Sequence, residues 1–123
     1  MTEWKVSLSM SEHTTDTSRE ARLLSALGLC AKAGKLIYGV PMICEALRRG
    51  GKNAPVMVLE SSDTSENTHK KISDKCSYYN TELVRLNSTG EELAAAVGKT
   101  SSLAAVAVTD ENICRLVEKN IRP

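Results

Sequence analysis

The chain has 123 residues, of which 41% are hydrophobic and 25% are charged, proportions typical of one ordinary globular domain with its own core. Its formal net charge of +1 argues against a protein that binds polyanions through net charge alone. Aromatic residues make up only 3%, which disfavours a protein that stacks single-stranded bases on an aromatic sheet. No apolar run is long enough to cross a bilayer and no signal-peptide core is present, so we expect a cytoplasmic protein without a membrane partner.

The N-terminal segment is polar, rich in serine and threonine, and without periodicity. We therefore expect residues 1–16 to form a flexible leader and residues 17–120 to form a single domain. Thr17 with Glu20 three residues later predicts a capping box at the start of the first helix. Apolar residues at helical spacing follow, and Gly34 is expected to end this helix.

The rest of the chain alternates short apolar strands with amphipathic helices. The expected strands span residues 36–38, 55–60, 82–86 and 103–108. The expected helices begin at Pro41, near Ser65, at Ser88 or Thr89 (a capping box with Glu91 or Glu92), and after Asp110. Some of these strands are apolar throughout, so the pattern predicts a three-layer α/β/α sandwich around a four-stranded, mostly parallel or mixed sheet.

The cysteines are widely spaced and form no C-x-x-C pair. Each one occupies a position where the helical pattern requires an apolar residue. We therefore expect buried thiols in a reducing compartment, with neither disulfides nor a metal site, at Cys30, Cys44, Cys76 and Cys114.

A search for catalytic groups finds no recognisable constellation. His13 lies in the expected leader and His69 on an apparently exposed helix face, so both are expected to be solvated. Asp63, Glu66 and Asp74 surround a helix start, where capping and solvation explain them. A phosphate-binding P-loop is absent, as is a G-x-G-x-x-G motif. We predict no catalytic residues, no metal and no cofactor.

The segment from residue 32 to residue 52 is locally basic. Its charged residues are Lys32, Lys35, Arg48, Arg49 and Lys52 against Glu45 alone. A helix start marked by Gly39 beside such charges favours phosphate binding, although a solvated helix face would give the same pattern. The loop at 98–102 is expected at the same edge, where it would add lysine and hydroxyl groups. The Tyr38 side chain is consistent with either a core or a solvent position.

Four segments also carry a resemblance to a known family. They read LLSALGLCAKAGKLIYG, EALRRGGKNAPVMVLESSD, SENTHKKISDKCSYYN and ELAAAVGKTSSLAAVAVTD. Their order and spacing resemble the L7Ae/L30e superfamily of ribosomal proteins that bind kink-turn RNA, and within it the small bacterial YlxQ-like members. The resemblance runs from about Leu23 to Lys119. It implies the same sandwich and an RNA-binding edge made by the second helix start and the loop before the last strand. The residues it assigns to RNA are Lys32, Gly34, Lys35, Gly39, Lys99, Thr100 and Ser101. We also expect Val40, directly after this glycine, to lie at the RNA contact.

The chain departs from the kink-turn binders directly after the glycine. Where they typically carry a polar trio, this chain has Val40, Pro41 and Met42, and Glu45 replaces a lysine. Two hypotheses follow. The chain is an RNA-binding protein of the ribosome or translation apparatus that holds structured RNA through backbone and shape. Alternatively, it has lost that recognition and uses the edge at Val40, Pro41 and Met42 to contact a protein partner.

Overall fold

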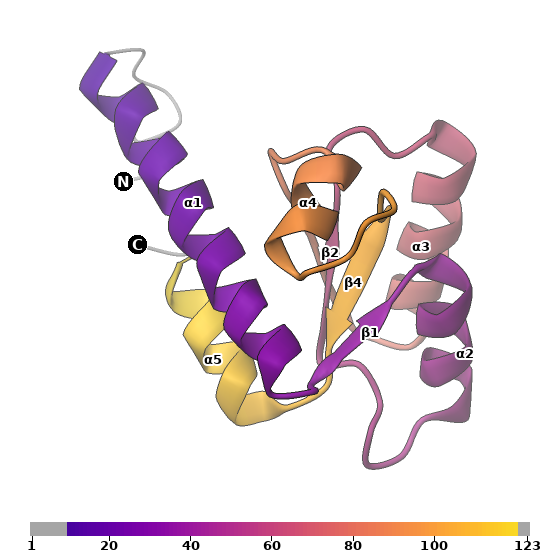
Figure 1. Cartoon of the computed structure of the whole chain (residues 1–123). Coiled ribbons are helices and arrows are strands. Elements are labelled where there is room, and N and C mark those ends of the chain that lie inside the picture. The colour runs from indigo at the N-terminus through magenta and orange to yellow at the C-terminus, as the bar shows by residue number, and fades with distance from the viewer. Residues whose placement is uncertain (1–9, 121–123) are drawn as a thin grey trace.

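The computed structural model describes the backbone of residues 10–120 and the side chains of residues 19–120. In this part of the chain five helices and four strands alternate (Figure 1). The helices are α1 (Met10–Lys32), α2 (Val40–Arg49), α3 (Glu66–Tyr78), α4 (Gly90–Ala96) and α5 (Glu111–Lys119). The strands are β1 (Leu36–Tyr38), β2 (Met57–Glu60), β3 (Glu82–Arg85) and β4 (Ala105–Val108).

The strands form one mixed sheet in the order β1-β4-β2-β3. β4 runs antiparallel to both β1 and β2, whereas β2 and β3 are parallel. Helices α1, α4 and α5 cover one face, and α2 and α3 cover the other (Figure 1). The predicted three-layer α/β/α sandwich with a mixed sheet is therefore confirmed.

Alternation along the strands divides the core into two clusters. Met57 and Leu59 of β2 pack beneath α1, α4 and α5, whereas Val58 faces α2 and α3. β4 follows the same alternation, with valines on the first face and the smaller Ala105 and Ala107 on the second. Glu60 shares the parity of Val58, so this carboxylate points into the layer that holds α3.

The capping signals read from the sequence are confirmed for three helices. The Ser65 hydroxyl accepts a hydrogen bond from the Thr68 N–H at the start of α3. Thr89 and Glu92 form a complete capping box at the start of α4. The Asp110 carboxylate accepts from two N–H groups in the first turn of α5. These interactions span three residues or fewer, which is why the sequence alone is enough to predict them.

The predicted start of α1 is wrong, because the helix begins at Met10 and not after Thr17. No proline or glycine lies between residues 10 and 27, so each added residue gains one hydrogen bond on a helix already formed. Residues 1–9 of the expected leader lie outside the described part, and its flexibility stays a prediction.

The cysteines occupy the apolar positions expected for them. Cys30, Cys76 and Cys114 are buried, and Cys44 is half-buried. Burial, with a smaller contribution from neighbouring thiols, raises the pKa of Cys30 and of Cys76 to about 11. Within residues 10–120, no helix combines the length and the apolar character needed to span a membrane.

Candidate nucleic-acid interface

The pairing of β1 with β4 places the two ends of the basic glycine turn at opposite ends of β1. Gly39 follows β1 at one end, where its N–H donates to the Ala105 carbonyl at 3.0 Å. Lys35 precedes β1 at the other end, where its carbonyl accepts from the Thr109 N–H at 3.1 Å. There its Nζ lies 3.9 Å from the Asp110 carboxylate. Lys35 is thus partly neutralised and separated from Gly39.

The start of α2 has no side chain that caps it. Gly39 is the N-cap residue, with φ +87°, and it makes no side-chain hydrogen bond. Pro41 occupies the first turn, where its missing N–H leaves no unpaired donor. Val40 is only 8% exposed and belongs to the core under α2 and α3, so its side chain offers nothing to a ligand. The hydrogen-bond donors at this helix start are therefore backbone N–H groups alone.

The loop at 98–102 meets β1 through Lys99. Its Nζ lies 4.3 Å from the centroid of the Tyr38 ring, a cation–π contact. Tyr38 is half-buried, packs against the core beneath α1 and α4, and faces a hollow of about 700 Å³. Lys32 lines the same hollow from the end of α1. The structure therefore brings Lys32 and Lys99 together beside the strand that leads into Gly39.

Of the remaining predicted site residues, two follow Lys99 in the chain and one precedes Lys35. Thr100 and Ser101 are exposed in the loop that follows Lys99. Gly34 ends α1 as expected, with φ +72° and its N–H donating to the Ala31 carbonyl. It lies next to Lys35 in the chain.

Gly90 braces the loop before β4. Its carbonyl accepts from the Leu103 N–H, and its own N–H donates to the Asp63 carboxylate at 2.9 Å. This bond, followed by one from the Ser61 hydroxyl, holds the pKa of Asp63 below its usual range. A Cβ at position 90 would press on the Ser102 hydroxyl and lie 2.7 Å from the Leu103 carbonyl oxygen. Position 90 therefore has room for glycine but not for a residue with a side chain.

The substitution Gly90→Ala is expected to lower the free energy of unfolding by about 2 kcal/mol, because the backbone at Leu103 must shift to admit the methyl group. Urea denaturation followed by circular dichroism measures this loss. Glu91→Ala is the matched control, since Glu91 is exposed in the same helical turn and its removal should cost about 0.5 kcal/mol. Equal stability of the two variants would contradict the close packing at Gly90.

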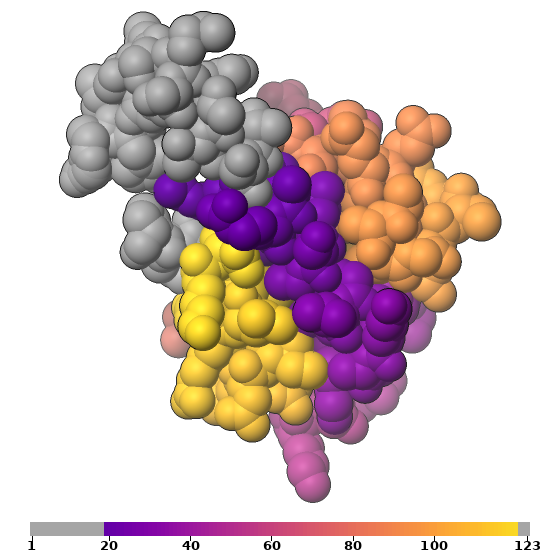
Figure 2. All heavy atoms as spheres, turned by 60° about the vertical axis from the view of Figure 1, so that its left-hand side comes forward, coloured from indigo at the N-terminus to yellow at the C-terminus, as the bar shows by residue number. Residues whose placement is uncertain are grey.

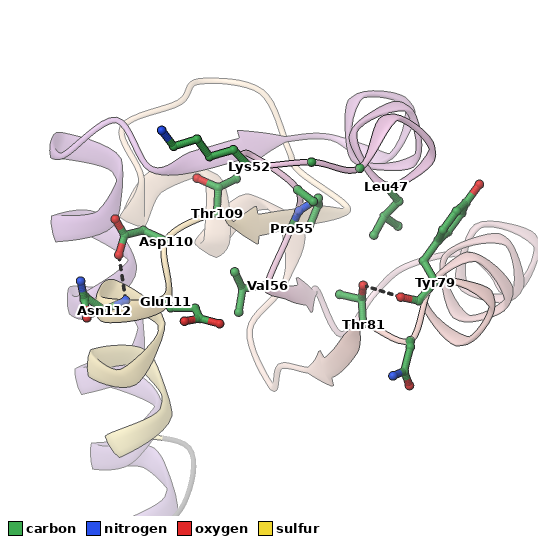
Figure 3. Close-up of a pocket in the computed structure, with 14 residues that line it drawn as sticks. Leu47, Lys52, Pro55, Val56, Tyr79, Thr81, Thr109, Asp110, Glu111 and Asn112 are labelled. Atoms are coloured by element: carbon green, nitrogen blue, oxygen red, sulfur yellow. Dashed lines mark hydrogen bonds between the residues drawn. The ribbon is translucent and has the colours of Figure 1, made fainter.

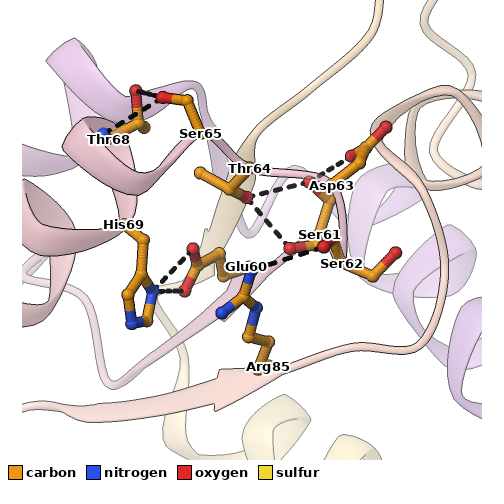
Figure 4. A network of polar contacts seen from close by, with 9 residues as sticks. All are labelled: Glu60, Ser61, Ser62, Asp63, Thr64, Ser65, Thr68, His69 and Arg85. Carbon is orange, nitrogen blue, oxygen red and sulfur yellow. Dashed lines mark hydrogen bonds and ion pairs between the residues drawn. The ribbon is translucent and has the colours of Figure 1, made fainter.

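A buried carboxylate lies at the end of β2, and the sequence reading missed its partner. Glu60 is fully buried, and its Oε1 and Oε2 lie 2.8 and 2.9 Å from Nδ1 of His69 in α3 (Figure 4). The His69 side chain is 37% exposed. The expectation that His69 is merely solvated is therefore wrong. The signal that could have revealed this pair is Glu60 itself. A glutamate within a strand that is otherwise apolar and buried needs a polar partner.

The other charged residues of the basic segment lie away from Lys32, Lys99 and Gly39. Arg48 and Arg49 lie at the far end of α2, where both contact the Glu45 carboxylate, at 2.6 and 3.6 Å. The Arg48 hydrogen bond is the main reason that the pKa of Glu45 is lowered. Lys52 and Asp110 both line a second hollow, of about 760 Å³ (Figure 3). The predicted basic segment is thus divided between the two ends of the strands.

Metal binding finds no support in the described side chains. Among them, no three or more histidine, cysteine, aspartate or glutamate residues are grouped to hold an ion. Glu60 and His69 carry side chains that could bind a metal, but they form only a pair.

The sequence and the fold of this chain both match known proteins. The model of the ribosomal protein L7Ae/L30e/S12e/Gadd45 family matches residues 21–117, which is most of the chain. The chain belongs to this family. It is similar to two proteins named RNA-binding protein YlxQ. The one from Bacillus subtilis (strain 168) is 34% identical over 85 residues, covering 69% of this chain and 80% of the relative. The one from Enterococcus faecium is 35% identical over 78 residues, covering 63% and 72%.

Two solved structures superpose on this chain over most of its length. A protein described as having unknown function, from Bacillus halodurans C, superposes with a TM-score of 0.73 at 31% identity. The match covers 82% of this chain and 97% of that one. A 15.5kD RNA binding protein of Giardia lamblia superposes with a TM-score of 0.68 over 85% of each chain. At 12% identity this second likeness concerns the fold alone.

Proposed function

We propose that this L7Ae-family chain is a cytoplasmic RNA-binding protein of the ribosome or translation apparatus that recognises a sharply bent, kink-turn-like RNA. The observation that carries this proposal is the position of Lys99 over Tyr38, which brings the loop at 98–102 to the strand that leads into Gly39. Lys32 adds a second positive charge to this edge. The YlxQ relatives, which are named as RNA-binding proteins, support the same function.

Recognition in this proposal depends on backbone and shape more than on base-edge contacts. The side chain of Val40 is buried, Pro41 has no N–H, and Met42 is apolar. None of the three side chains has a donor, and the Met42 sulfur is only a weak acceptor, so they cannot read a base edge by strong hydrogen bonds. Lysine contacts to phosphates and the uncapped N–H groups of α2 therefore supply the affinity, and the bend of the RNA supplies the selectivity.

A protein-binding role has support from one observation. Met42 is 59% exposed, and Pro41 beside it is also exposed, so an apolar patch lies at the start of α2. The burial of Val40 reduces this patch to two residues. We therefore keep protein binding as the second candidate function.

A titration of labelled RNA tests the proposal directly. We expect tighter binding to a kink-turn RNA than to an unkinked duplex of equal length, measured by fluorescence anisotropy at 50 and 200 mM salt. Two lysine–phosphate contacts predict a loss of about tenfold in affinity across this salt range. Equal, weak binding to both RNAs would remove the kink-turn role. Binding of neither RNA would favour the protein-binding candidate.

A further inference from the structure

Two of the three tyrosines of this chain lie next to each other at the end of α3. The ring centroids of Tyr78 and Tyr79 are 4.8 Å apart and the ring planes meet at 84°, an edge-to-face arrangement. Tyr79 is half-buried and packs against the core cluster beneath α2 and α3, so it supports its neighbour. Tyr78 itself is 80% exposed. The end of α3 therefore presents an aromatic ring to the solvent on a fixed support.

The last turn of α2 lies beside this tyrosine pair. Leu47 and Tyr79 line the same hollow from the ends of their helices (Figure 3). The pKa of the Arg48 guanidinium is raised, first by Glu45 and to a smaller extent by Tyr79 nearby. Arg48 donates from Nε and from one terminal nitrogen to the two Glu45 carboxylate oxygens, at 3.2 and 2.6 Å. This fork fixes the plane of the guanidinium and leaves its other terminal nitrogen available for a phosphate oxygen.

The charge around the tyrosines is positive. Glu45 is shared by two guanidiniums, because Arg49 also lies 3.6 Å from its carboxylate, so two positive charges face one negative charge. Lys75, exposed in the last turn of α3, adds another positive charge. The one acidic residue in the last two turns of α3 is Asp74, which is paired with Lys70 at 3.4 Å. We refer to Arg48, Arg49, Lys75, Tyr78 and Tyr79 as the tyrosine patch.

The tyrosine patch suits a nucleic acid better than a protein surface. Protein interfaces usually bind through a core of several apolar side chains. The other exposed large hydrophobic residues among the described side chains lie elsewhere, namely Leu29 on α1, Met42 at the start of α2 and Leu116 on α5. Tyr78 is therefore an isolated ring among cations. Proteins that bind single strands combine such rings, on which bases stack, with positive charges that neutralise the neighbouring phosphates.

We propose that the tyrosine patch binds a single-stranded segment of the same RNA, with one base stacked on Tyr78 and the adjoining phosphates near Arg49 and Lys75. This inference rests on the proposed function, because the kinked part of the RNA must be held at Gly39. Helix α2 connects the two places, since it begins directly after Gly39 and its 10 residues span about 15 Å. A single strand advances about 3.4 Å per nucleotide, so about five nucleotides are enough to reach the patch.

A single-stranded extension of the RNA tests the inference. The probes are a fluorescein-labelled kink-turn RNA with blunt ends and the same RNA carrying about ten unpaired adenosines on one end or on the other. With the unchanged protein, the extension on one end should tighten binding about tenfold, a typical effect of one base stacked on an aromatic side chain. Tyr78→Ala should abolish this gain and leave binding of the blunt RNA unchanged. Tyr78→Trp should keep the gain, because stacking needs the ring and not the hydroxyl group.

The charge of the patch gives a second readout. Arg49→Gln should decrease the slope of log affinity against log salt by about one for the extended RNA and leave the slope for the blunt RNA unchanged. Leu116→Ala and Arg115→Gln are the matched controls, since both residues are exposed on α5. Helix α5 lies with α1 and α4 on the face shown in Figure 2, across the sheet from the tyrosine patch. Neither control should change the gain.

The patch and the kink-turn edge fail in different ways in this assay. An unchanged gain in Tyr78→Ala, or tight binding of the blunt RNA with no gain from either extension, would overturn the inference while the proposed function stands. The patch would then be free for an acidic protein segment. Binding of the extended RNAs alone, lost in Tyr78→Ala, would support the patch and remove the kink-turn role. Failure of the unchanged protein to bind any of the RNAs would overturn the proposed function itself, and the inference with it.

Discussion

Replacing His69 by alanine is expected to lower the free energy of unfolding by about 3 kcal/mol. The reason is the environment of Glu60, whose carboxylate is fully buried and has His69 as its partner at 2.8 and 2.9 Å. Removal of the imidazole leaves a carboxylate in the core without that partner, and the desolvation penalty is then uncompensated. Urea denaturation at neutral pH measures the loss.

A second substitution distinguishes this cause from a simple loss of packing. Glu60→Met in the His69→Ala background should restore most of the stability, because an apolar side chain of similar length no longer needs a polar partner. Lys70→Ala is the control, since Lys70 is an exposed neighbour whose ion pair with Asp74 should be worth under about 1 kcal/mol. If His69→Ala is as stable as Lys70→Ala, the contact with His69 does not stabilise the buried Glu60 carboxylate.

The elements of this fold are largely predictable from the sequence because their signals are local. Ser65, Thr89 and Asp110 each mark a helix start through hydrogen bonds within three residues. The apolar run in β4 likewise needs no knowledge of the rest of the chain to be read as a buried strand. The start of α1 was missed because the polar residues before Thr17 give no periodic signal, although nothing there interrupts a helix.

The candidate site was only partly predictable, because it depends on the order of strands in the sheet. Lys32 and Lys35 are neighbours in sequence, yet Lys35 lies beside Asp110 and Lys32 shares a hollow with Lys99. The pairing of Glu60 with His69 depends in the same way on where α3 lies over β2. Such contacts are decided by packing between layers, and no spacing within the sequence encodes them.

The double substitution Lys32→Gln with Lys99→Gln is expected to weaken binding to a kink-turn RNA about 100-fold at low salt, with about tenfold from each lysine. The two positive charges lie on the proposed edge, and no carboxylate lines the hollow that they share. Their removal should also decrease the slope of log affinity against log salt by about two, because two fewer counterions are released on binding. Anisotropy titrations over a series of salt concentrations measure both quantities.

The loss of Lys99 has a second physical consequence, which separates its role from that of Lys32. Lys99 also contacts the Tyr38 ring, so Lys99→Gln removes a contact that helps to hold the loop against β1. It should therefore weaken the preference for kinked over duplex RNA, whereas Lys32→Gln should weaken binding to both RNAs equally. Lys52→Gln, in the hollow at the opposite end of the strands, is the control and should change neither affinity nor slope. A salt slope that falls with Lys52→Gln and stays constant with the double variant would place the RNA at the other end of the strands.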